Sequence, residues 1–68
     1  MTLSDTARRH LAEARAQLRV ITERLADGDE ALDTVAFATL VGAASRLHQS
    51  FVDAFGSVEH ERALAERV

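Results

Sequence analysis

Apolar residues recur every three or four positions along the first part of the chain, which is the spacing of an amphipathic α-helix. Successive members are separated by 4, 3, 4, 3 and 4 residues, a heptad spacing typical of a helix that packs lengthwise against another helix. Thr2 or Ser4 is placed to cap the start, and Arg24 suits the negatively polarised end. The pattern predicts a helix over about 3–26 whose packed positions are Ala7, Leu11, Ala14, Leu18, Ile21 and Leu25.

Two glycines divide the rest of the chain. Gly28 is placed to end the first helix in a left-handed conformation, and Asp29 or Asp33 can accept the free amides that open the next helix. Gly56 repeats this arrangement with Ser57 behind it. We therefore expect a second helix over about 30–55 and a short third helix over about 58–67.

The second helix is apolar over more than half of its circumference. Its seam has spacings of 3, 4, 3, 4, 3 and 4 and comprises Phe37, Leu40, Ala44, Leu47, Phe51, Ala54 and Val58. Further residues flank this seam: Val41, His48 and Phe55 on one side, and Ala36, Ala43 and Ser50 on the other. Because a helix that is apolar nearly all round is normally surrounded, one partner helix cannot cover it.

The short link predicts that the two long helices form an antiparallel hairpin. The resulting fold class is all-α, a single helical domain over 1–68, and two hairpins joined through their second helices would complete a four-helix bundle. We expect a homo-oligomer, with a dimer favoured, and a different protein is the other candidate for covering the face. The expected interface residues are Phe37, Leu40, Val41, Leu47, His48, Phe51 and Phe55. His48 at such an interface would make assembly sensitive to pH between about 6 and 7.

The composition excludes several classes of protein. The 68 residues include no Cys, Trp or Tyr, which removes disulfide scaffolds, zinc–thiolate sites and aromatic platforms for bases or sugars. No basic leader with an apolar core opens the chain, and no apolar run approaches about 18 residues, so we expect a cytoplasmic protein without a membrane partner. Thirteen alanines, and eight Arg with no Lys, are typical of a GC-rich bacterial or phage genome.

The sequence offers little catalytic chemistry. His10 and Glu13 share a helix face, and Glu59, His60 and Glu61 form a second small cluster, yet neither has the ligand count of a metal site. Serines occupy cap or surface positions, and the spacings of calcium and phosphate loops are absent. We therefore expect no enzyme, no metal and no cofactor. The favoured function is a small non-enzymatic protein–protein interaction module, a regulator or accessory subunit.

Two alternatives remain open at this stage. Residues 34–53 fit a DNA-binding helix-turn-helix with a turn near Gly42, in which Arg46 and Gln49 would contact the nucleic acid. The charge argues against it, since residues 1–26 carry +2, 27–56 carry −4 and 57–68 carry −1. The second alternative is an oligomer that binds a phosphate-bearing small ligand through the arginines of the first helix, Arg8, Arg15 and Arg24.

Overall fold

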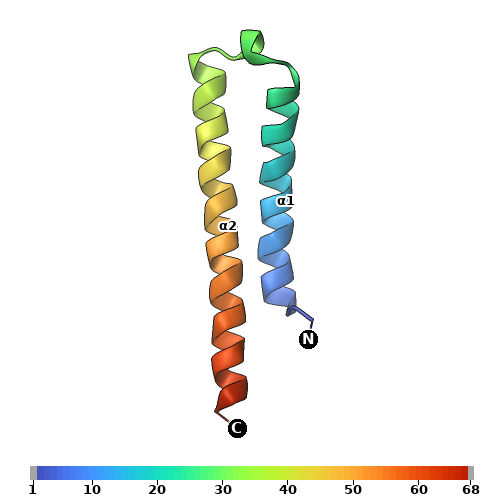
Figure 1. Cartoon of the computed structure of the whole chain (residues 1–68), viewed down its shortest axis with the longest axis vertical. Helices are drawn as coiled ribbons and strands as arrows, with labels where there is room; N and C mark the ends of the chain where they lie inside the picture. Colours follow the sequence, from blue (N-terminus) through green and yellow to red (C-terminus); the bar gives the residue numbers. More distant parts are fainter. Residues whose placement is uncertain (1, 68) are drawn as a thin grey trace.

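The computed structural model describes residues 2–67 and shows a hairpin of two long helices. Helix α1 spans Asp5–Ala26, helix α2 spans Thr34–Glu66, and the link between them contains one 3-10 turn, η1, at Asp29–Ala31. Figure 1 shows α1 and α2 side by side and antiparallel, with α2 continuing past the start of α1. The predicted all-α helical hairpin is therefore confirmed.

The ends of the helices follow from local chemistry. The Ser4 hydroxyl accepts a hydrogen bond from the Ala7 amide at 3.2 Å, and the Asp33 carboxylate accepts one from the Ala36 amide at 2.7 Å. Each bond satisfies one of the amides that have no partner in the first turn of a helix. Gly28 has a φ of 84°, a conformation that costs glycine little and lets the chain leave α1. The predicted roles of Ser4, Gly28 and Asp33 are confirmed.

The predicted end of the second helix is wrong. The chain has no break at Gly56 and no separate helix over 58–67, because α2 runs without interruption to Glu66. A helical glycine costs about 1 kcal/mol relative to alanine, too little to end a helix when no proline follows. Gly42 also lies within α2, so residues 34–53 contain no turn of the kind that a helix-turn-helix requires.

The contact between the helices is rotated from the expected one. Leu18 and Leu25 are 51% exposed, although the sequence pattern placed them in the core. The positions that face the other helix form what we call the inner seam, and all of them are buried or half-buried. On α1 the inner seam is Ala7, His10, Ala14, Gln17 and Ile21, and on α2 it is Ala36, Leu40, Ala43, Leu47, Ser50 and Ala54.

Side-chain size explains the rotation. The observed and expected seams of α2 have the same heptad spacing and share Leu40, Leu47 and Ala54. They differ by one residue at the alternate positions, so periodicity alone does not choose between them. The inner seam is the one that is rich in alanine, which lets two helices approach closely. The buried apolar residues are accordingly small, with one exception, and comprise Ala7, Ala14, Leu40, Ala43 and Ala54. No large side chain within residues 2–67 is fully buried.

We expect Gly56→Ala to stabilise the protein by about 0.5 to 1 kcal/mol, because alanine loses less conformational freedom than glycine in a helix. A Cβ at this position meets no described atom within 4 Å, so the added methyl group is accommodated. Urea unfolding followed by circular dichroism measures the change.

Gly28→Ala is the matched control for this substitution. It should destabilise the protein, since the φ of 84° is strained for alanine although space is equally free. A loss of stability in Gly56→Ala would contradict the uninterrupted α2 or reveal a close neighbour at Gly56.

Candidate interaction surface

The hairpin is a layer one helix thick, so it has two broad sides. On each helix, residues that directly precede an inner-seam residue lie to one side, and residues that directly follow one lie to the other. Because α1 and α2 are both right-handed and run antiparallel, a two-fold axis perpendicular to the layer relates them approximately. Rotation about that axis exchanges the two helices but does not exchange the two sides of the layer. Preceding residues of both helices therefore share one side, and following residues share the other.

The side formed by preceding residues is polar. Glu13 of α1 and Arg46, Gln49 and Asp53 of α2 each come directly before an inner-seam residue, and they line one shallow depression together with Gln17 and Ser50. The Gln49 side-chain amide donates a hydrogen bond to the Asp53 carboxylate at 2.8 Å. Two carboxylates beside Arg46 oppose the binding of an anion here.

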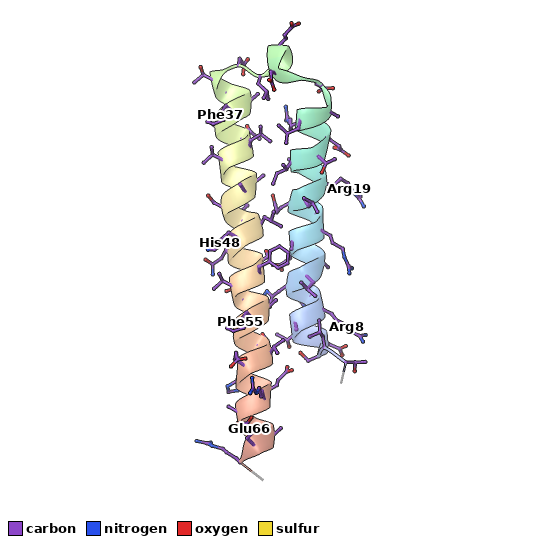
Figure 2. All side chains as sticks on the ribbon, in the orientation of Figure 1. Arg8, Arg19, Phe37, His48, Phe55 and Glu66 are labelled. Carbon is purple, nitrogen blue, oxygen red and sulfur yellow. The ribbon has the colours of Figure 1, made fainter. Side chains whose placement is uncertain are left out.

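The side formed by following residues is apolar on α2. We call the residues that directly follow the inner seam of α2 the outer stripe: Phe37, Val41, Ala44, His48, Phe51 and Phe55. All six are exposed, and the phenylalanines are 60%, 52% and 66% accessible in chain order. Figure 2 shows Phe37, His48 and Phe55 in succession along α2, none of them between the two helices.

Helix α1 extends this surface. Leu11 and Leu18 directly follow the inner-seam residues His10 and Gln17, and Leu25 continues the same row one heptad later. The row and the outer stripe lie on the same side of the layer, and together they form what we call the apolar face.

The apolar face is large for so small a protein. The three phenylalanines alone expose about 350 Å², taking about 200 Å² as the area of one such side chain. Val41, Leu18 and Leu25 are each 51% exposed and add to this area. Contiguous apolar patches of more than a few hundred Å² are unusual on monomeric proteins and mark sites of interaction.

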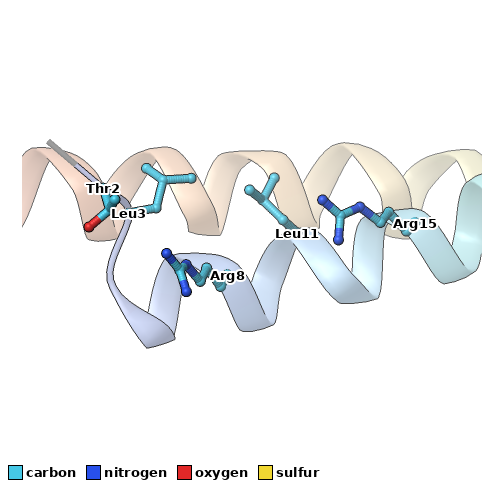
Figure 3. A pocket seen from close by; sticks show the side chains of 5 residues that line it. All are labelled: Thr2, Leu3, Arg8, Leu11 and Arg15. Carbon is cyan, nitrogen blue, oxygen red and sulfur yellow. The ribbon is translucent and has the colours of Figure 1, made fainter.

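Arginines border the apolar face on α1. Arg8 and Arg15 line an open depression with Leu11, Thr2 and Leu3, and Figure 3 shows the two guanidinium groups on either side of Leu11. They follow Ala7 and Ala14, so they alternate with the leucines of α1. Arg24 lies in the last turn of α1, and Arg46 and Gln49 lie on the polar side, so the structure does not bring the predicted anion contacts together.

The predicted interface residues divide into two groups. Leu40 is 8% exposed and Leu47 is half-buried, and both belong to the inner seam that packs against α1. These two side chains are therefore not accessible in the hairpin for the predicted contact with a second copy. Phe37, Val41, His48, Phe51 and Phe55 are exposed and remain candidates for contact with a partner. The sequence interpretation missed the contribution of α1 because it assigned Leu18 and Leu25 to the core.

The histidines and carboxylates do not assemble into a metal site. His10 Nδ1 lies 3.8 Å from Glu13 Oε2, and this buried nitrogen has no hydrogen-bond partner among the described residues. Groups of three or more potential metal ligands are absent from residues 2–67. Over the same residues, neither helix has the length and apolarity that crossing a membrane requires.

Comparison with known proteins found no match, whether to family models, to curated protein sequences or to solved structures.

We expect His10→Leu to stabilise the hairpin by about 1 kcal/mol, since it removes a buried nitrogen that has no hydrogen-bond partner and adds apolar contact at the inner seam. The free energy of unfolding in urea is the measurement. Glu13→Gln serves as control, because it removes the neighbouring charge and keeps the imidazole. Destabilisation by His10→Leu, at unchanged oligomeric state, would show that the histidine makes a stabilising hydrogen bond in solution.

Proposed function

We propose that the protein is a small non-enzymatic helical interaction module that self-assembles through the outer stripe of α2. The observation that carries this proposal is the distribution of side-chain size on α2. Its inner seam is made mostly of alanine and serine, whereas its three phenylalanines stand in the exposed outer stripe.

Energetics supports this assignment. Burial of a phenylalanine or leucine side chain contributes about 1.5 to 3 kcal/mol, and burial of a methyl group contributes about 0.8 kcal/mol. The inner seam therefore supplies little of the apolar burial that the sequence has available. A chain of 68 residues without a disulfide needs an efficient core, and a second copy provides one by covering the outer stripe.

The chemistry of the face favours a protein partner over a nucleic acid. The outer stripe contains no arginine or lysine, and the chain as a whole carries a formal charge of −3. Nucleic-acid affinity depends largely on cations that neutralise phosphates. Apolar and aromatic side chains in the centre with arginines at the edge are typical of a protein–protein contact.

Light scattering over a concentration series tests the proposal. We expect the parent chain to reach twice its mass of 7.4 kDa, with a thermal midpoint that rises with concentration because unfolding and dissociation are coupled. Phe55→Ser should weaken the dimer by at least tenfold, since it removes a large apolar side chain from the contact.

Val35→Ser is the matched control. Val35 is also on α2 and is 75% exposed, but it directly precedes Ala36 and lies on the polar side of the hairpin. Its substitution should leave the dissociation constant unchanged. A folded monomer at about 100 µM, or equal effects of the two substitutions, would overturn self-assembly through the outer stripe. The first of these results would leave the face for a different protein.

A further inference from the structure

The spacing of the outer stripe is symmetric about residue 46. Its members are separated by 4, 3, 4, 3 and 4 positions, so the stripe has the same spacing in either direction. A second α2 laid antiparallel, with a two-fold axis at the level of residue 46, brings each stripe position opposite another. The facing pairs are Phe37 with the partner's Phe55, Val41 with the partner's Phe51, and Ala44 with the partner's His48.

Resting on the self-assembly proposed above, we infer that the partner is a second copy whose α2 packs antiparallel on this α2 about residue 46. The links of the two hairpins then lie at opposite ends of a four-helix bundle. Three observations favour this arrangement over one with both links at the same end.

Side-chain size is the first. In the antiparallel register Val41 meets the partner's Phe51 and Ala44 meets the partner's His48, so a small side chain faces a larger one in each of the four central layers. A parallel pairing would set Ala44 against its own copy between a layer of two valines and a layer of two histidines, and Phe51 against its own copy in the layer after that. Layers of such unequal thickness leave a gap, whereas facing large and small side chains fill the space evenly.

The arginines of α1 are the second observation. If the two-fold axis ran along the helices and the apolar faces stacked flat, the outer stripe would lie on the partner's α1. Arg8, Arg15 and Thr22 interrupt the leucines of that helix, so guanidinium groups would face phenylalanines and lose water. An axis perpendicular to the helices places α2 on the partner's α2, where the apolar side chains are continuous, and α1 on the partner's α1, so no phenylalanine faces the arginines.

Charge is the third observation. The link end carries four carboxylates within seven residues, Asp27, Asp29, Glu30 and Asp33. Two such links side by side repel each other, although salt screens part of the repulsion. The end of α2 that faces the link in the antiparallel register carries both signs: Arg62 and Arg67 against Glu59, Glu61 and Glu66. The antiparallel arrangement sets each acidic link against this segment of mixed charge and keeps the two links apart.

Spin labels measure the orientation directly, because the natural chain has no cysteine. Thr34→Cys and Ser45→Cys each place one label per chain on an exposed position of α2 outside the outer stripe. In the antiparallel register the two copies of residue 34 are 24 residues apart along the axis, about 36 Å at 1.5 Å per residue. The two copies of residue 45 are within about 3 Å along the axis, so their labels are separated mainly by the width of the helix pair, about 10 Å.

Each outcome of the distance measurement is decisive. A long distance at residue 34 with a short one at residue 45 supports the antiparallel arrangement. Short distances at both positions show that the links share one end, which overturns it and leaves self-assembly intact. A shift by one heptad changes the 34–34 distance to about 46 Å or about 26 Å, depending on its direction, and overturns the register. If both labelled variants are monomeric, the result overturns the proposed function itself.

A double-substitution cycle tests the facing pair without labels. Phe37 and Phe55 of one chain are 18 residues apart, about 27 Å along α2, so within one copy their effects are independent. In the antiparallel dimer each contacts the other across the axis. We expect Phe37→Ala and Phe55→Ala each to raise the dissociation constant at least tenfold. The increase in the double variant should be at least fivefold smaller than the product of the two single increases.

Phe37→Ala combined with Phe51→Ala is the matched control, because residue 51 faces Val41 of the other copy. The increases in dissociation constant caused by these two substitutions should multiply in the double variant. Helix content measured at protein concentrations above each dissociation constant shows that the variants are folded when compared. Multiplicative effects of Phe37→Ala and Phe55→Ala would overturn the pairing even if the protein is a dimer.

Discussion

The close approach of two helices along a seam of alanine is the constraint on which the rest of this structure depends. Ala7 and Ala14 on α1 lie against a seam of α2 that includes Ala43 and Ala54, so little side chain separates the two helices at these positions. A thin interface of this kind aligns the helices but buries little apolar area for each residue. Every larger side chain that does not fit between the helices must then find its place on the outside. The exposed phenylalanines of α2 are the direct result.

The sequence predicted the local structure well because that structure has local causes. Ser4 and Asp33 cap their helices through hydrogen bonds that span three residues, and Gly28 supplies the positive φ that ends α1. These interactions need no knowledge of the rest of the fold. Gly56 shows where such reasoning stops. The same residue type ends one helix and is accommodated inside the other, and the difference lies in whether the following residues can continue the helix.

The rotation of both helices was not predictable from periodicity. The inner seam and the outer stripe lie one residue apart on α2 and share the heptad spacing, and the sequence interpretation joined members of both, such as Phe37 and Leu40, into a single seam. The structure selects the row of small residues because the facing seam of α1 is also small at Ala7 and Ala14. Which row packs inward is thus a property of the pair of helices. A single helix pattern contains no information about it.

A helix that carries two seams one residue apart has a place for two neighbours, and this separates the roles of α1 and α2. The outer row of α1 is apolar only at every seventh residue, where Leu11, Leu18 and Leu25 alternate with arginine and threonine. Such a row suits the edge of an assembly, where long cationic side chains cover apolar surface and keep their charge in water. The outer stripe of α2 is apolar throughout, apart from His48. In the proposed assembly α2 therefore lies at the centre and α1 at the edge: the inner seam of α2 packs the hairpin, and the outer stripe is the surface proposed to contact a second copy.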